Sequence, residues 1–342
     1  MSFSKPIQAN FIVSLCLLAL LSLAAPTREA RADETIKLRL DFFTAAIHSP
    51  YFLAVERGWY KKAGLDVTIE DGSGSINTTQ LVDAGNFDLG EVSLGAMAVG
   101  RAKGLNVISI ASYLRQGSIG ILVKQSLGVK SLKDLEGKKV LYTAASMEGP
   151  FIERLFPDNG VPIDKVNLLN VDGPSKIGMY LAGQTDGVVT DIPGMMSIAI
   201  GQVPSDALPF SDYGLYIPSF GMIARTDTLK TKSAAIKAFN SISCASWKYI
   251  MDGHDDEAVN ATMAQRPNSP SKPAALHEQL VQYRKFLTTP ATKDMPTCFQ
   301  SAADWENAIK GMEHATVIPA GTKPSLYFTN EYIDLDYAKS IL

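Results

Sequence analysis

The sequence is short of cysteine, histidine and positive charge, and each shortage excludes a class of protein. Three cysteines and four scattered histidines in 342 residues are too few and too far apart for a metal cluster. The 32 basic residues are outnumbered by 35 acidic ones, so the composition does not favour nucleic acid or an anionic bilayer as a partner. We therefore expect no metal, no cofactor and no nucleic-acid partner.

Sequence signatures of catalysis are also absent. There is no G-x-S-x-G nucleophile elbow and no H-E-x-x-H zinc motif. The run Gly72-Ser73-Gly74-Ser75 lacks both the G-x-G-x-x-G spacing of dinucleotide sites and the lysine of a P-loop. Without a candidate nucleophile, the sequence predicts a protein that is not an enzyme.

Long apolar runs are missing after the first 32 residues. Lys5, the apolar residues 11–23 and the small-x-small sequence Ala30-Arg31-Ala32 predict a signal peptide that is cleaved after Ala32, with an uncleaved anchor as the alternative. Removing residues 1–32 from 342 leaves 310, and takes away three basic residues and one acidic residue, so the net charge falls from −3 to −5. A chain of that length predicts two lobes, and the signal peptide predicts that the protein is exported.

Two cysteines, Cys244 and Cys298, remain in the predicted mature chain. An oxidising compartment permits a disulfide between them, but two thiols in a chain of this size are equally typical of small buried hydrophobes. The sequence leaves both alternatives open.

Apolar periodicity after the signal segment predicts an α/β fold. Alternating residues predict strands at 36–43, 65–69 and 87–92. Ser49-Pro50 predicts a helix start with Ser49 as the N-cap, Gly64 predicts its end, and a second helix is expected at 77–84. Strands joined by single helices predict a mostly parallel sheet flanked by helices.

An internal repeat predicts a second lobe of related topology. Ala84-Gly85-Asn86-Phe87-Asp88 recurs as Ala182-Gly183-Gln184-Thr185-Asp186, each a helix end followed by a turn into a strand. We expect the second lobe over 117–217, with a strand at 139–143 and a helix at 148–158. The first lobe is expected over 33–116 and 218–342, with a returning strand at 219–225 and helices at 232–251, 255–265, 274–287 and 302–314.

A ligand in such a fold binds beyond the carboxyl ends of the strands, between the lobes. Ser93 and Asp191 each follow the repeated turn by five residues, so we expect them at matching strand ends, facing each other across the cleft. The full set of expected ligand-binding residues is Phe43, Thr44, His48, Tyr51, Ser73, Gly74, Ser75, Ser93, Leu94, Ala145, Ser146, Met147 and Asp191.

Each of these residues also has a purely structural interpretation. The run 72–75 is equally typical of an ordinary turn between strand and helix, and His48 of a residue that packs or caps locally. Asp191 could simply end a strand, although a carboxylate facing a cleft is a natural partner for an amine or a ring N–H.

Several segments resemble one family throughout the mature chain. These are LDFFTAAIHSPYFLAVERGWYKKAGLDV, LVDAGNFDLG, SLKDLEGKKV, YLAGQTDGVV, and Trp305 with YFTNEYI at 327–333. They resemble the periplasmic solute-binding proteins of ABC importers, in the aliphatic-sulfonate and thiamine-pyrimidine group. The resemblance implies a location in the periplasm and a two-lobed, type II-like binding-protein fold. It also implies a monomer that binds a small solute between its lobes, and transmembrane permease subunits as partners.

One branch of that group contains enzymes that synthesise the thiamine pyrimidine and consume a histidine. His48 stands in the matching context H-x-P-x-F-L-A, but the branch's Cys-rich segment is replaced by Tyr216-Ile217-Pro218-Ser219-Phe220. Among the binding proteins, His48 and Asp191 resemble the heterocycle binders, whereas Ser73, Ser75, Ser93 and Ser146 would suffice for a sulfonate. We expect an aromatic heterocycle first, a sulfonate or aromatic acid second, and the enzyme third.

Overall fold

The computed structural model describes residues 1–3, 34–199 and 201–342. The predicted signal peptide and its cleavage site after Ala32 lie outside these residues, apart from the first three. Within the described part, no helix combines the length and the apolar character needed to cross a membrane.

The first of two five-stranded sheets has the strand order β2-β1-β3-β10-β4. β1 is parallel to β2 and to β3, whereas β10 is antiparallel to both β3 and β4. The strand expected at 219–225 is therefore confirmed as a late return to the sheet that the N-terminal strands begin. The strands are β1 Glu34–Arg39, β2 Leu65–Glu70, β3 Leu89–Ser93, β4 Val107–Ser112 and β10 Phe220–Arg225.

The second sheet repeats this plan with the order β7-β6-β8-β5-β9. Its one reversed strand, β5, again lies fourth in the order, antiparallel to β8 and β9. Four of the five strands in each sheet therefore run in one direction, which confirms the mostly parallel α/β prediction. The strands are β5 Ile119–Lys124, β6 Lys139–Tyr142, β7 Asn167–Asn170, β8 Gly187–Asp191 and β9 Ser205–Pro209.

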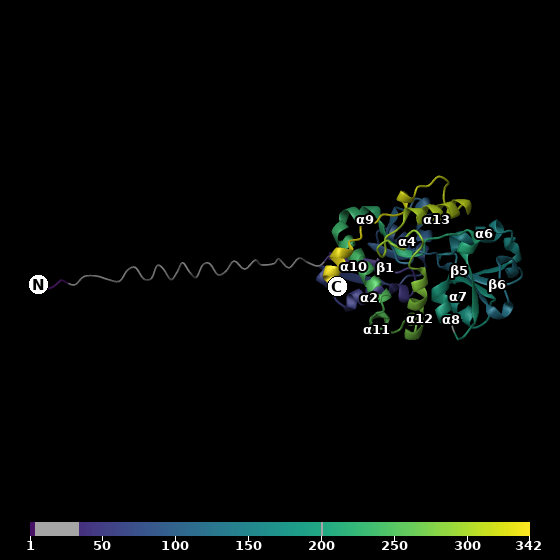
Figure 1. Ribbon diagram of the computed structural model, residues 1–342, viewed down its shortest axis with the longest axis horizontal. Helices are drawn as coiled ribbons and strands as arrows, with labels where there is room; N and C mark the ends of the chain where they lie inside the picture. Colours follow the sequence, from purple (N-terminus) through teal and green to yellow (C-terminus); the bar gives the residue numbers. More distant parts are fainter. Residues whose placement is uncertain (4–33, 200) are drawn as a thin grey trace. The chain divides into compact units, whose positions relative to one another are not determined.

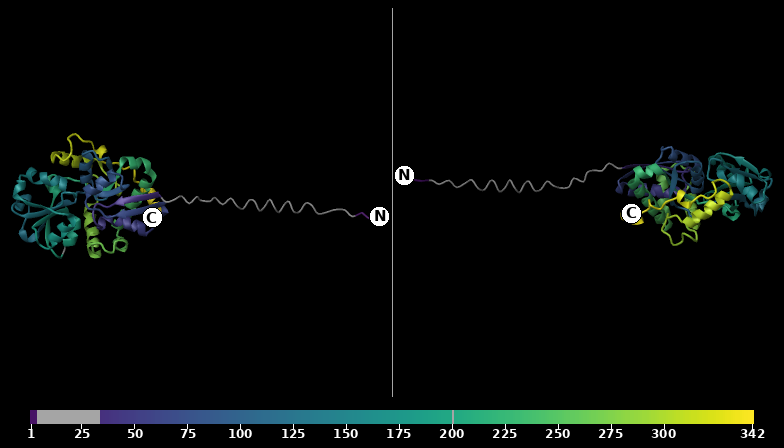
Figure 2. Two further views of the ribbon diagram at one scale, coloured as in Figure 1. Left: turned by 180° about the vertical axis from the view of Figure 1, so that it is seen from behind. Right: turned by 90° about the horizontal axis from the view of Figure 1, so that it is seen from above.

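The helices cover the sheets (Figure 1). In Figure 2 the second sheet and its helices, coloured teal, form one group that lies beside the other elements of residues 34–342. The boundaries expected between the lobes, after Gln116 and after Ile217, stay a prediction. The α-helices are α2 Ser49–Glu56, α3 Trp59–Lys62, α4 Ser75–Asp83, α5 Leu94–Ala102, α6 Gly149–Asp158, α7 Gly173–Leu181, α8 Ile192–Ala199, α9 Thr226–Thr231, α10 Ser233–Met251, α11 Asp255–Gln265, α12 Pro273–Tyr283, α13 Ala302–His314 and α14 Leu335–Ile341.

The helix predicted from Ser49 to Gly64 differs from the prediction in two ways. Gly58 has a left-handed φ of 67°, which divides the segment into α2 and α3. His48 rather than Ser49 is the N-cap, with Pro50 in the first turn. The buried Ser49 hydroxyl instead accepts a hydrogen bond from Thr262 on α11 (2.9 Å), so tertiary packing uses the group that local capping would have used.

The repeated turn has a structural basis. Asp88 accepts a hydrogen bond from the backbone N–H of Lys37 (2.9 Å) and returns one from its own N–H to the Lys37 carbonyl (3.0 Å). Asp186 makes the same pair of bonds with Lys139 (2.8 and 2.9 Å). Each aspartate thus joins the start of its own strand to the neighbouring parallel strand, and the strands end at Ser93 and Asp191.

Cys244 and Cys298 form a disulfide, with their Cα atoms 5.9 Å apart. The sequence left open a disulfide or two unpaired thiols, and the structure contains the disulfide. It joins α10 to a segment whose Cys298 carbonyl accepts a hydrogen bond from Ser112 at the end of β4 (3.0 Å). The cross-link therefore lies against the first sheet.

Candidate ligand-binding site

A cavity of about 90 Å³ lies where the ends of strands from both sheets meet. The loop after β1 forms the first wall of the cavity. A second wall consists of the end of β8 and the starts of α6, α7 and α8. Helix α12, far along the chain, closes a third side. The lining residues are Asp41, Phe42, Phe43, Ala45, Ile47, His48, Ser146, Met147, Glu148, Gly173, Lys176, Ile177, Thr190, Asp191, Gly194, Met195, Ile198, Phe220, Gln279 and Tyr283.

Five of the thirteen expected ligand residues line this cavity: Phe43, His48, Ser146, Met147 and Asp191. The other eight do not line the cavity. They are Thr44, Tyr51, Ser73, Gly74, Ser75, Ser93, Leu94 and Ala145.

Hydrogen bonds and packing account for the positions of several of these eight. Thr44 is buried, and its N–H and hydroxyl bond the carboxylate of Asp71 (3.3 and 3.2 Å). Tyr51 lies in the core, edge-on to Tyr113. Leu94 is fully buried at the start of α5, whereas Ser73 is exposed.

Ser75 and Ser93 bond each other beneath the cavity. The Ser75 hydroxyl accepts from the Ser93 N–H (3.0 Å) and donates to Asp41 (3.4 Å). The Ser93 hydroxyl is buried and has no hydrogen-bond partner among the described residues. Ser93 therefore ends β3 as predicted, but the cavity wall does not include it.

At two glycines, loops of the first sheet closely approach loops of the second. A Cβ on Gly74 (φ 139°) would lie 2.6 Å from the carbonyl oxygen of Ala145. A Cβ on Gly173 would lie 1.9 Å from the ring of Phe42. At Gly74 only glycine fits, because the facing atom is backbone and φ is positive, whereas a side chain at Gly173 would require the Phe42 ring to move. Gly74 and Ala145 therefore lie where the loops of the two sheets touch.

Asp191, the last residue of β8, presents a free acceptor. Its Oδ2 accepts from the Gly194 N–H (2.9 Å) and from the Tyr283 hydroxyl on α12 (3.2 Å). Its Oδ1 is buried and has no hydrogen bond of standard geometry to the described residues. The nearby Ser118 hydroxyl, which lowers the pKa of Asp191, also bonds the Ser219 hydroxyl (2.5 Å), and either hydroxyl can be the donor of that bond. Burial raises the pKa of Asp191 to about 6, against the hydrogen bonds that lower it.

A buried ion pair lies on the same side of the cavity. The ammonium of Lys176 on α7 contacts Glu148 Oε1 and donates to the Val189 carbonyl (2.9 Å). The N–H of Thr143 also donates to Glu148 Oε1 (3.0 Å). Glu148 Oε2 is buried without a partner in residues 34–199 and 201–342. The ion pair has no net charge, and it leaves this carboxylate oxygen available to a ligand.

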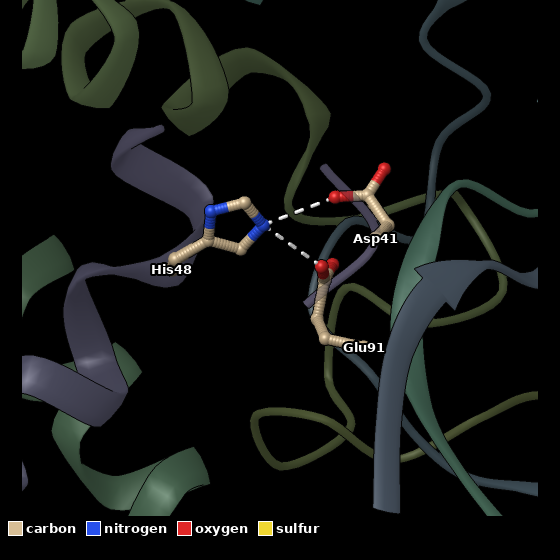
Figure 3. A group of neighbouring side chains, drawn as sticks. All are labelled: Asp41, His48 and Glu91. Carbon is tan, nitrogen blue, oxygen red and sulfur yellow. Dashed lines mark hydrogen bonds and ion pairs between the residues drawn. The ribbon is translucent and has the colours of Figure 1, made fainter. Parts of the chain in front are cut away.

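Three buried side chains of the first sheet form a cluster beside the cavity (Figure 3). His48 Nε2 lies 3.1 Å from Asp41 Oδ1 and 3.0 Å from Glu91 Oε2. Asp41 follows β1, Glu91 is in the middle of β3, and His48 directly precedes α2. All three are at least 97% buried, with exposures of 3%, 1% and 0% for Asp41, His48 and Glu91.

The cluster has the donor atoms of a metal site, within 4.8 Å of one another, but its hydrogen bonds favour a proton. The Ala45 N–H donates to His48 Nδ1 (3.0 Å), so that nitrogen carries a lone pair and Nε2 carries the ring proton. A metal on Nε2 would leave a ring with no proton on either nitrogen. We interpret the cluster as one Nε2–H shared between two carboxylates.

Burial, charge and hydrogen bonds act on the pKa values of the cluster in different directions. Burial alone would lower the pKa of His48, but hydrogen bonds and charge from Asp41 and Glu91 raise it to about 9. A second proton on Nδ1 would point at the Ala45 N–H, however, and the geometry therefore holds the ring neutral. Burial and the charge of Asp41 raise the pKa of Glu91 to about 7, so Glu91 is the carboxyl that takes up a proton near neutral pH.

Sequence reasoning missed the most polar parts of the site. Glu91 carried a usable signal, because a charged residue inside the strand sequence LGEVS implies a buried partner. Gln279 and Tyr283 of α12 carried none. Gln279 accepts from the Ala46 N–H (2.8 Å), lies 3.5 Å from the Gly194 carbonyl, and so connects the first loop to α8.

The chain is similar to one protein family and to both binding proteins and synthases. The family model described as NMT1/THI5 like matches residues 45–258. A formylaminopyrimidine-binding protein of Halalkalibacterium halodurans is 24% identical over 315 residues, which is 88% of this chain and 92% of that one. A 4-amino-5-hydroxymethyl-2-methylpyrimidine phosphate synthase of Legionella pneumophila is 22% identical over 313 residues, with coverage of 87% and 92%.

Solved structures establish the fold. The alkanesulfonate-binding protein of Xanthomonas axonopodis pv. citri, bound to MOPS, superposes with a TM-score of 0.62 at 14% identity, covering 85% of this chain and 96% of that one. A Candida albicans protein described as having the generic periplasmic binding protein fold gives a TM-score of 0.60 at 16% identity, with coverage of 90% and 94%. Residues 34–342 have that fold.

Proposed function

Because the chain belongs to the NMT1/THI5-like family, we propose that it is the solute-binding component of an ABC importer and captures a small N–H-bearing aromatic heterocycle. The observation that carries this proposal is the Asp191 carboxylate, whose Oδ1 is buried beside the cavity with no partner in the described residues. A buried acceptor without a donor costs free energy, and a ligand N–H removes that cost.

The walls of the cavity suit a flat ring of limited size. Phe42, Phe43 and Tyr283 line it, and aromatic side chains pack well against the face or edge of another ring. Its volume of about 90 Å³ is well below the roughly 300–1,000 Å³ of sites for drug-sized ligands. These features support a single ring such as an aminopyrimidine.

Charge argues against an anionic ligand. Asp191 and Glu148 both present unused carboxylate oxygens, and Lys176, the lysine on the wall, is already paired with Glu148. Of the four serines that could donate to a sulfonate, Ser146 alone lines the cavity. A sulfonate would meet like charge and few donors, so the heterocycle is favoured over it.

The same family includes synthases, and we propose that this chain does not catalyse their reaction. Both cysteines in the described residues, Cys244 and Cys298, are bonded to each other, and no cysteine stands in the segment at 216–220. His48 is held by Ala45, Asp41 and Glu91, which suits a structural role. We place the protein in the periplasm as a monomer, cleaved after Ala32 and serving transmembrane permease subunits.

A thermal-shift screen of the mature protein with aminopyrimidines, sulfonates and aromatic acids tests this proposal. A ligand at one hundred times its Kd adds about 2.7 kcal/mol to the free energy of unfolding, which a melting curve detects. We expect an aminopyrimidine to raise the Tm and to be recovered unchanged by mass spectrometry. A product that forms on incubation, or a Tm raised only by sulfonates, would overturn it.

A further inference from the structure

A second, larger cavity of about 610 Å³ adjoins the ligand cavity and is called the vestibule below. The two cavities share three lining residues, Phe43, Ile177 and Ile198. Helices α7 and α8 form one wall of the vestibule, and the segment at 270–275, at the start of α12, forms the other. The remaining lining residues are Pro174, Leu181, Ser197, Gln202, Pro270, Ser271, Lys272, Ala274 and Ala275.

The surface of the vestibule is mostly apolar, and three of its four polar side chains are bonded within the protein, whereas the fourth, Lys272, is exposed. The Ser197 hydroxyl donates to the Pro193 carbonyl (2.7 Å), and that of Ser271 to the Thr44 carbonyl (2.9 Å). The Gln202 amide donates to the Ile198 carbonyl (2.9 Å). These bonds leave half-buried Ile177, Leu181 and Ile198 as the main groups that a ligand would contact.

We infer that the natural ligand is an N–H-bearing ring that carries an apolar substituent, with the ring beside Asp191 and the substituent extending past Phe43 into the vestibule. This inference rests on the proposed function and adds the ligand class to it. A bare ring would fill the ligand cavity and leave the apolar walls of the vestibule in contact with water. Burial of a hydrocarbon chain there would remove that contact.

The expected gain in affinity is measurable. Each fully buried methylene contributes about 4-fold to binding, so a four-carbon chain that is only partly buried should still contribute about 10-fold or more. Burial of apolar surface should also make the heat capacity change of binding more negative.

The test is calorimetric titration of the mature protein with three probes: 4-amino-2-methylpyrimidine and its analogues with a butyl chain at C5 or in place of the C2 methyl. We expect at least one butyl analogue to bind about 10-fold or more tightly than the parent ring. In Leu181→Ser, which changes a residue of the vestibule wall but not of the ligand cavity, this advantage should shrink several-fold. Leu169→Ser, on the exposed edge strand β7, is the matched control and should leave it unchanged.

The outcomes separate this inference from the function on which it rests. If the parent ring binds and neither butyl chain improves affinity, the inference is wrong while the proposed function stands. If the advantage is present but Leu181→Ser and Leu169→Ser reduce it equally, the chain does not lie in the vestibule and the inference is again wrong. If none of the three probes binds, the proposed function fails and the inference fails with it.

Discussion

The two sheets share one strand order but end in different chemistry. β3 ends at Ser93 and carries Glu91 in its middle, whereas β8 has Val189 and Asp191 at the matching positions. At the first sheet, Asp41 and Glu91 bond a shared His48. At the second, Asp191 and Glu148 each keep one buried oxygen without a partner in the described residues.

The position of the unpartnered atoms distinguishes the two halves further. Glu91 Oε1 and Ser93 Oγ also lack partners in the described part of the chain, but neither residue lines the ligand cavity. Asp191 and Glu148 both do. Asp41 and His48 line the cavity too, but they bond each other. We therefore propose that the polar groups of the first sheet mainly stabilise the fold, and that Asp191 and Glu148, at the ends of the second sheet, bind the ligand.

The largest expected effect is on stability, from His48→Ala at the first sheet. The substitution leaves Asp41 and Glu91 buried and facing each other, which should lower the free energy of unfolding by about 3–5 kcal/mol in urea titrations at pH 7. Adding Glu91→Gln should recover part of that loss, because one buried charge is then removed. His277→Ala, at a partly exposed histidine, is the control; a His48→Ala loss no greater than the control's would disprove the structural role.

A second stability effect should also be confined to the first sheet. Replacing Cys244 and Cys298 together by serine removes the cross-link next to β4 and should cost about 2–4 kcal/mol of unfolding free energy. Ligand affinity, which we assign to the second sheet, should change less than 2-fold. Denaturation and calorimetry on the same double variant measure both, and a loss of affinity with unchanged stability would reverse the assignment.

The pH dependence of binding should follow Asp191. Because the pKa of its carboxyl is about 6 in the free protein, affinity for an uncharged aminopyrimidine should fall up to about 10-fold per pH unit below 6 and level off above 7. The free energy of unfolding should change in the opposite direction and fall as the pH rises. The folded pKa exceeds the ordinary 3.8, so ionising Asp191 costs folding free energy as pH rises from about 4 to 6. Binding that is flat from pH 5 to 8 would contradict the role of Asp191.

Much of the fold was predictable because its signals are local. Apolar periodicity and capping residues located helices 255–265 and 302–314 at the bounds that α11 and α13 have. The repeated A-G-x-x-D turn located the ends of β3 and β8, since its aspartate bonds the neighbouring strand in both sheets. The division of one expected helix at Gly58 depended on a left-handed turn that the pattern alone did not reveal.

The site was less predictable because its partners are distant in sequence. Tyr283 bonds Asp191 from 92 residues away, and Gln279 bonds Ala46 from 233 residues away. Strand-end reasoning placed Ser93 and Asp191 at equivalent positions. It did not indicate that Ser93 would be covered, because the Ser75 bond and the packing of β10 against β3 depend on the complete fold.

Calorimetric titration of an aminopyrimidine into the native protein, Asp191→Ala and Ser93→Ala at pH 7.5 tests the difference between the two sheets most directly. We predict that Asp191→Ala weakens binding by about 1–3 kcal/mol, because a ligand donor loses its buried acceptor, and that Ser93→Ala leaves the Kd within about 2-fold. Melting curves of the free variants show whether each one is folded. Unchanged affinity in folded Asp191→Ala, or an equal loss in both variants, would contradict the assignment of ligand binding to the second sheet.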